Sequence, residues 1–162
     1  MEILRKVVDI DSINTIKSVF KNGVSNKPIV DKHSEYINKL IKYSNIYYCD
    51  ITNQKLLTVL KQFIAPTDFD HIYSIHWIKY ESGYECLEHI DMESYTTYIL
   101  NLNDEFEGGE LFVNGINTES KQGDIVIFNG MKDKHRVSKV TKGIREVLVI
   151  WISPTSKLKK LI

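Results

Sequence analysis

Two potential metal ligands stand two residues apart in the tripeptide HID, where His89 and Asp91 flank Ile90. Side chains alternate between the two faces of a β-strand, so residues two apart point the same way. If this segment is a strand, both side chains can reach one metal ion. By itself an H-x-D pair indicates little, because a histidine beside an aspartate on a strand is more often a surface pair.

A third potential ligand, His135, begins a later predicted strand in the segment KHRVSKV. Two histidines and one carboxylate on one face of an octahedral ion form the arrangement that holds non-haem Fe(II). Three positions on the ion then stay free, two for a keto acid and one for dioxygen. One anionic and two neutral ligands leave the ion positive, which suits an anionic keto acid. The same ligand types also hold Zn or Mn in hydrolases.

Arg145 follows ten residues after His135. Alternation predicts two faces of this strand. One face carries Arg145, Val147, Val149 and Trp151, and the other carries Leu148, Ile150 and Ile152. An arginine that faces a barrel interior needs a buried anion, and a guanidinium pairs with a carboxylate through two hydrogen bonds. A small dicarboxylate is therefore the expected partner, and an acidic side chain at the barrel rim is the alternative. This spacing of Arg145 and Trp151 argues against a hydrolase.

The elements that must position these residues change type near Pro66. Over about 11–63, apolar residues recur every three or four positions, which predicts two or three amphipathic helices. Three groups show this spacing: Ile13, Ile16, Val19 and Phe20; Tyr36, Ile37, Leu40 and Ile41; and Leu56, Leu57, Leu60 and Phe63. The turn-rich segment GVSNKP separates the first two groups.

After this helical block, segments rich in β-branched and aromatic residues alternate with glycine-containing breaks, which predicts short strands. The predicted strands are 72–80, 87–91, 95–102, 110–113, 124–128, 135–140 and 144–152. This order predicts an α+β, mainly β chain, with a double-stranded β-helix core of the jelly-roll or cupin-like kind and N-terminal helices packed on one face. We expect a single domain, 1–162, with mainly helical support over 1–66 and the jelly-roll core over 70–153.

The composition of the chain argues against some classes of binding partner. Lys plus Arg equals Asp plus Glu at 21 each, so no net charge attracts nucleic acid or an anionic membrane. The two cysteines, Cys49 and Cys86, have neither disulfide-framework nor zinc-knuckle spacing. The start of the chain lacks a signal peptide, and no apolar run approaches the roughly 18 residues of a membrane span. We therefore expect a cytoplasmic protein with no nucleic-acid or membrane partner.

The stretch over about 72–152 resembles the catalytic core of the prolyl 4-hydroxylase-like branch of the Fe(II)- and 2-oxoglutarate-dependent oxygenases. The resemblance rests on the order and spacing of the segments KYESGYE, HID, TTYILNLN, EFEGGELF, KQGDIVIF, HRV and GIREVLVIW. It implies that the HID positions and the later histidine bind iron, which are His89, Asp91 and His135. It also implies that Arg145 and Tyr80 hold the far carboxylate of 2-oxoglutarate.

The same resemblance places Trp151 in the pocket wall near the substrate, and two positions depart from the family pattern. Cys86 stands where many prolyl hydroxylases carry a substrate-contacting tyrosine. Asn101 stands where a tyrosine often reaches the co-substrate, and its amide can still donate a hydrogen bond. We therefore expect Asn101 in the co-substrate site and Cys86 in the substrate pocket. The shape of this pocket should differ from that of the prolyl hydroxylases.

The resemblance implies a dioxygenase that hydroxylates a C–H bond and releases succinate and carbon dioxide, with ascorbate as a possible reductant. A prolyl residue of a protein or peptide ranks first as substrate, and a free amino acid or other small molecule ranks second. A non-catalytic cupin-like binding module is a further alternative. Asp91 argues against a halogenase, and Trp151 replaces the second arginine usual in nucleic-acid demethylases. The oligomeric state and the roles of His76 and Arg136 stay open.

Overall fold

The strands form two antiparallel sheets that face each other. The computed structural model describes residues 1–23, 45–48 and 53–153. Among these, the larger sheet has the order β1 (Glu2–Leu4), β9 (Ile125–Phe128), β5 (Thr96–Asn101), β11 (Val140–Ile152), β3 (Ile72–Glu81) and β2 (Asn45–Tyr48), with β6 (Phe106–Gly108) paired to β11. The smaller sheet has the order β4 (Cys86–His89), β10 (His135–Val137), β7 (Leu111–Val113) and β8 (Ile116–Asn117).

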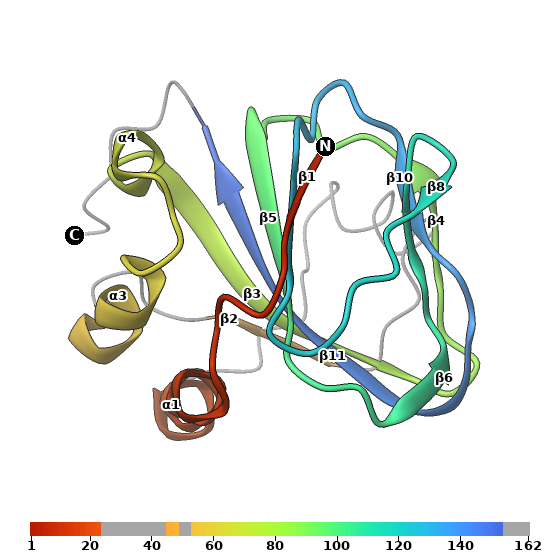
Figure 1. Cartoon of the computed structure of the whole chain (residues 1–162), viewed down its shortest axis with the longest axis horizontal. Helices are drawn as coiled ribbons and strands as arrows, with labels where there is room; N and C mark the ends of the chain where they lie inside the picture. Colours follow the sequence, from red (N-terminus) through yellow and green to blue (C-terminus); the bar gives the residue numbers. More distant parts are fainter. Residues whose placement is uncertain (24–44, 49–52, 154–162) are drawn as a thin grey trace.

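Helices cover the outer side of the larger sheet (Figure 1). They are α1 (Ile10–Gly23), α3 (Gln54–Leu60) and α4 (Pro66–Phe69). The apolar face of α1, with Ile16 and Phe20, packs in one cluster with Leu56 of α3 and Trp77 of β3. The Phe20 and Trp77 rings meet edge to face at 5.8 Å between centroids. Burial of each such side chain stabilises the fold by about 1.5–3 kcal/mol, which fixes the helices against the sheet.

Strand β11 separates this outer core from the barrel interior. Its residues Leu148 and Ile150 join the helix-covered cluster, whereas Val147 and Val149 join a second cluster between the two sheets. Arg145 continues the inward-facing series at the other end of the strand and is 2% exposed. The alternation predicted from the sequence therefore holds, and the mainly β, double-stranded β-helix architecture with helices on one face is confirmed.

Four short strands were not predicted. β1 and β2 lie in the segment expected to be mainly helical, and they add edge strands by pairing with β9 and β3. β6 and β8 form in segments predicted as turns. The second predicted helix, at Tyr36 to Ile41, lies outside the described residues.

Two helices have side-chain caps at their starts. The carboxylate of Asp9 accepts a hydrogen bond from the Ser12 N–H at 2.7 Å, and Asn53 caps α3 by accepting from the Leu56 N–H at 3.1 Å.

No helix in the described part of the chain combines the length and apolar character needed to cross a bilayer. The cytoplasmic location stays a prediction.

Candidate active site

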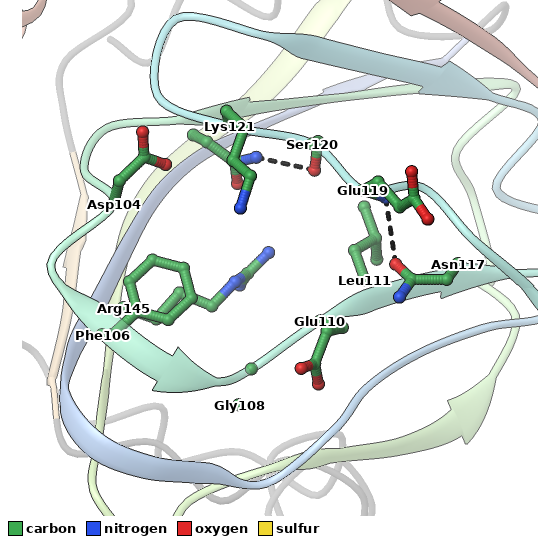
Figure 2. A pocket seen from close by; sticks show the side chains of 12 residues that line it. Asp104, Phe106, Gly108, Glu110, Leu111, Asn117, Glu119, Ser120, Lys121 and Arg145 are labelled. Carbon is green, nitrogen blue, oxygen red and sulfur yellow. Dashed lines mark hydrogen bonds between the residues drawn. The ribbon is translucent and has the colours of Figure 1, made fainter.

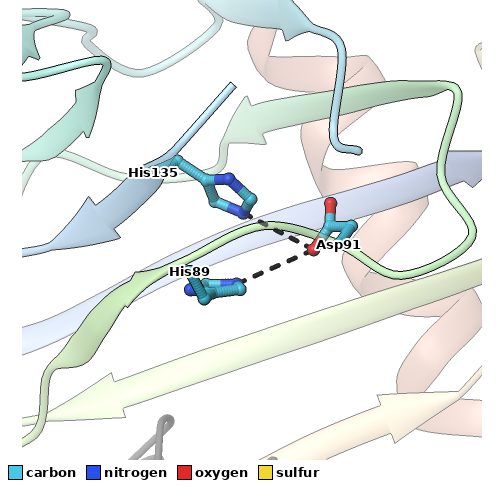
Figure 3. Close-up of side chains that lie close together, drawn as sticks. All are labelled: His89, Asp91 and His135. Atoms are coloured by element: carbon cyan, nitrogen blue, oxygen red, sulfur yellow. Dashed lines mark ion pairs between the residues drawn. The ribbon is translucent and has the colours of Figure 1, made fainter. Parts of the chain in front are cut away.

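His89 and His135 meet where β4 and β10 pair. They are register partners, and their ring centroids lie 4.2 Å apart. Oδ1 of Asp91 lies 3.7 Å from Nε2 of His89 and 3.5 Å from Nε2 of His135. One ligand atom from each of the three residues lies within 4.8 Å of the others. The structure thus brings together all three predicted metal ligands (Figure 3).

Asp91 reaches this point by a different route from the one predicted. Strand β4 ends at His89, so Asp91 lies beyond the strand, and the interpretation that strand alternation orients it was wrong. Its backbone N–H instead donates to the carbonyl of Gly130 at 2.8 Å, which anchors the turn after β4 on the loop between β9 and β10. The side chain then points back toward the two histidines.

Backbone carbonyls orient both imidazole rings. Nδ1 of His89 lies 2.8 Å from the Leu87 carbonyl, and Nδ1 of His135 lies 3.0 Å from the Asp133 carbonyl. Because a carbonyl only accepts hydrogen bonds, each Nδ1 carries the proton and each Nε2 keeps its lone pair. Both lone pairs are therefore available on the side of Asp91, as a metal ion requires.

The surroundings favour an ionised Asp91 and a neutral His89. Burial would raise the pKa of Asp91, but the neighbouring His135 and His89 and the hydrogen bond from the Thr97 hydroxyl outweigh burial and bring it below its ordinary 3.8. Burial, together with the neighbouring His135, lowers the pKa of His89 below 6.5. At neutral pH the site therefore offers an ionised carboxylate and a neutral His89 imidazole.

Arg145 lines a cavity of about 380 Å³ at the other end of the barrel interior. Figure 2 shows its guanidinium and the Lys121 side chain pointing into this space. Burial lowers the pKa of Arg145, while Tyr80, Cys86 and Glu110 raise it, and a guanidinium stays charged at neutral pH. Among the described residues, no carboxylate lies within ion-pair distance of this buried cation. Arg145 is therefore available to a carboxylate from outside.

Two predicted co-substrate residues adjoin Arg145. Tyr80 is its register partner on β3, and the guanidinium carbon lies 5.4 Å from the centre of the Tyr80 ring. Asn101 lines the cavity, and its Nδ2 donates to the Ser120 hydroxyl at 2.7 Å. The sequence interpretation gave no role to Ser120 and Lys121, which lie in the connection between β8 and β9, although Lys121 begins the segment KQGDIVIF. The cavity lining does not include the three potential metal ligands.

Cys86 lies between the potential metal ligands and the residues around Arg145. It is buried, and its Sγ lies 3.5 Å from Nδ1 of His89. Burial and the charge of Asp91 raise the pKa of the thiol to about 12, while Arg145 opposes this shift. Cys86 is therefore a neutral thiol that packs behind His89.

Trp151 contacts Asp91, one of the three potential metal ligands. Its Nε1 donates to Oδ2 of Asp91 at 3.1 Å, and its ring meets the His76 ring edge-on at 4.6 Å between centroids. His76 in turn lies 2.7 Å from the Ser74 hydroxyl. Arg136 turns away from His135 and stacks over the Phe112 ring at 3.7 Å. His76 thus supports Trp151, whereas Arg136 covers the outside of the smaller sheet.

Residues 75–153 match the sequence profile of the 2OG-Fe(II) oxygenase superfamily. The matched stretch contains the two histidines, Asp91 and Arg145 in the arrangement just described. This part of the chain is similar in sequence to that superfamily. The match begins in β3 and continues through β11, so it includes both groups of predicted site residues and omits the N-terminal helices.

A curated relative shows the same similarity. The chain is 35% identical over 106 residues to a PKHD-type hydroxylase of Synechococcus sp. (strain CC9311). That match covers 58% of this chain and 46% of the relative, so the chain spans about half the length of the curated relative.

Two solved structures share the fold. A Pseudomonas putida prolyl-4-hydroxylase has a TM-score of 0.65 and 16% identity, with 94% of this chain and 91% of that chain covered. The viral collagen prolyl hydroxylase of Paramecium Bursaria Chlorella virus-1, solved as a 2OG complex, has a TM-score of 0.69 and 13% identity, with 96% of each chain covered. At such identities the likeness shows the fold alone.

The residues of this site fit the metal and co-substrate of the superfamily. Two imidazole nitrogens and one carboxylate oxygen are a donor set for Fe(II). A buried arginine without an acidic partner among the described residues, facing a cavity, suits one carboxylate of 2-oxoglutarate. Fe(II) and 2-oxoglutarate are therefore the cofactor and co-substrate that this site implies.

Proposed function

We propose that the chain is an Fe(II)- and 2-oxoglutarate-dependent dioxygenase that hydroxylates a C–H bond, with a prolyl residue of a peptide or protein as its substrate. The observation that carries the dioxygenase assignment is the convergence of His89, Asp91 and His135, with both Nε2 atoms within 3.7 Å of one carboxylate oxygen. Bound Fe(II), with 2-oxoglutarate and dioxygen, supplies the oxidation: the keto acid becomes succinate and carbon dioxide, and the substrate C–H becomes C–OH.

The residues of the chain have separate parts in this reaction. His89, His135 and Asp91 would hold the metal, and the Leu87 and Asp133 carbonyls fix the two imidazole rings for this role. Arg145 binds the far carboxylate of the co-substrate, with Tyr80 against its guanidinium and the Asn101 amide beside it. Sequestration of this carboxylate in the barrel strengthens the pairing, since water is excluded around a buried guanidinium.

An apolar rim next to the metal ligands supports a peptide substrate. Four large side chains in the two loops that carry Asp91 and Gly130 are well exposed: Ile90 47%, Met92 63%, Tyr95 55% and Met131 46%. The loops are joined by a hydrogen bond from the Met131 N–H to the Ser94 carbonyl at 3.0 Å. Exposed apolar side chains beside a polar site favour a ligand that brings apolar surface of its own. Two of the structurally similar proteins are prolyl hydroxylases by name, which supports the prolyl choice.

The substrate test compares classes of acceptor. Protein loaded with Fe(II), 2-oxoglutarate and ascorbate in air would be given proline-rich peptides, free proline or other free amino acids, and hydroxylated product would be measured by mass spectrometry. We expect a mass gain of one oxygen on prolyl residues of a peptide, and faster succinate formation in its presence. Met92→Ser with Met131→Ser should weaken the peptide effect several-fold and leave peptide-free succinate formation unchanged. Hydroxylation of a free amino acid alone would replace the prolyl proposal by the small-molecule one.

A further inference from the structure

The two oxygens of Asp91 have different surroundings. Oδ1 faces Nε2 of both histidines, at 3.7 Å from His89 and 3.5 Å from His135. Oδ2 instead accepts two hydrogen bonds, from the Thr97 hydroxyl at 2.7 Å and from Nε1 of Trp151 at 3.1 Å. One oxygen therefore lies toward the potential metal position, and the other is already occupied by the protein.

The Thr97 hydroxyl has one proton and two close oxygens. It lies 2.7 Å from Oδ2 of Asp91 and 2.8 Å from the hydroxyl of Ser94, which is fully buried. Hydrogen bonds to an ionised oxygen are roughly twice as strong as those between neutral groups, so the proton goes to Asp91. The Ser94 hydroxyl donates its own proton to the Thr96 carbonyl at 2.9 Å, and its oxygen lies against the Thr97 hydroxyl.

The indole of Trp151 has a single polar atom, and it points at the same carboxylate oxygen. Contact with the His76 ring supports the indole from one side, and the hydroxyl of Ser74 holds His76. Thr97 and Trp151 are register partners on adjacent strands β5 and β11. Both donors thus lie on inner strands of the larger sheet, near the strand ends, whereas Asp91 lies in a loop.

Gly130 has no side chain, and this leaves space for the Asp91 carboxylate and the Thr97 hydroxyl. A Cβ atom at this position would lie 2.6 Å from Oδ2 of Asp91 and 2.5 Å from Oγ1 of Thr97. Any side chain there would therefore displace the carboxylate or the hydroxyl. The Gly130 carbonyl also accepts the Asp91 N–H at 2.8 Å, so backbone and side chain of Asp91 are fixed from the same loop.

We propose that Thr97 and Trp151 are positioning residues that restrict Asp91 to binding metal through Oδ1 alone. A carboxylate that bound through both oxygens would occupy one of the three positions that an octahedral ion must keep for the keto acid and dioxygen. The two donors prevent this because Oδ2 would have to give up both hydrogen bonds. The inference rests on the proposed metal site and adds a role for residues that contact no substrate.

Co(II) titration of the metal-free full-length protein tests the proposal. Its visible absorption reports the ligands and coordination number, and its affinity is measured in the same experiment. We expect Thr97→Val and Trp151→Phe each to weaken Co(II) binding about 10-fold and to change the absorption spectrum, since loss of an outer partner of a metal ligand typically costs 10–100-fold in affinity. Thr97→Ser keeps the hydroxyl and should restore both. Thr96→Val, on the neighbouring position of β5, is the matched control and should bind as wild type.

The outcomes separate this inference from the proposed function. Absence of Co(II) binding by the wild type would overturn both. Wild-type binding that His89→Ala abolishes, with Thr97→Val and Trp151→Phe unchanged in affinity and spectrum, would overturn the inference alone. Should Thr97→Val fail to fold, Trp151→Phe decides, because phenylalanine keeps an aromatic ring for the contact with His76 and lacks the N–H donor.

Discussion

Arg145 and Tyr80 face each other across the β11–β3 ladder, and the guanidinium carbon of Arg145 lies 5.4 Å from the centre of the Tyr80 ring. The contact supports a buried cation on one side while the cavity opens on the other. A buried charge without an ionic partner destabilises the folded state unless a bound ligand supplies the opposite charge. The arrangement therefore indicates a binding site whose occupant is an anion.

Replacement of Arg145 should separate binding from stability. We expect Arg145→Met to weaken 2-oxoglutarate binding about 100-fold, the equivalent of about 3 kcal/mol, because a charge-assisted pair is lost. The metal-free protein should keep its thermal midpoint or gain slightly, since a buried charge is removed. Calorimetric titration of the Mn(II)-loaded protein with 2-oxoglutarate measures the first effect. Arg136→Met, whose side chain stacks on Phe112, is the control, and equal losses in the two variants would contradict the assignment.

A methyl group at Gly130 should damage the metal site more than the fold. Gly130→Ala places its Cβ against Asp91 and Thr97, so we expect Co(II) affinity to fall at least about 10-fold. Gly83→Ala is a matched control: its φ of +93° makes alanine strained, yet nothing lies within 4 Å of the new Cβ. It should cost about 1 kcal/mol of stability and leave metal binding intact. Equal Co(II) affinity in both variants would show that Gly130 has no special place in the site.

Acid should destabilise the metal-free protein through His76. Burial lowers the pKa of His76 to about 3 from its ordinary 6.5. Between these values the unfolded chain binds a proton that the folded protein does not, so stability falls as the pH drops below about 6.5 and is fully present above it. Urea unfolding of wild type should lose about 1 to 2 kcal/mol more than His76→Gln between pH 7.5 and pH 5. Parallel losses in the two proteins would contradict a neutral buried imidazole.

Helix α1 should contribute to the fold without contributing to the site. Phe20 is 1% exposed in the outer core, whereas Ile10 at the start of the same helix is 55% exposed. We expect Phe20→Ala to lower the free energy of unfolding by about 3–5 kcal/mol and Ile10→Ala by less than about 0.5 kcal/mol. Folded Phe20→Ala protein should bind Co(II) as tightly as wild type. Weaker binding would mean that the helix positions the site as well as covering the sheet.

The features that could be predicted from the sequence are those encoded locally. Alternation along β11 placed Arg145 inside and Leu148 outside, since period two needs no knowledge of the partner strands. The periodicity of α1 likewise identified its apolar face. The edge strands β1 and β2 were not predicted, because segments of three or four residues are too short to show a clear alternation of apolar and polar residues. These two segments are strands because they pair with β9 and β3.

The candidate site was predictable in its residues and less so in its geometry. The spacing of His89, Asp91 and His135 gave the ligand set, yet Asp91 lies beyond the strand end and is oriented by Gly130. The Trp151 bond to Asp91 joins residues 60 positions apart, so only the folded barrel reveals it. Thr97 did carry a signal, because alternation along TTYILNLN places it on the same face as Asn101.

The measurement that tests the central claim most directly is a reaction under ¹⁸O₂. Protein purified without air would be loaded with Fe(II), 2-oxoglutarate and ascorbate, then exposed to ¹⁸O₂, and succinate would be analysed by mass spectrometry. We predict succinate that carries one ¹⁸O atom, formed by wild type and lost in Asp91→Ala. Absence of succinate from a protein that binds Fe(II), or succinate without the label, would contradict the assignment of this site to a dioxygenase.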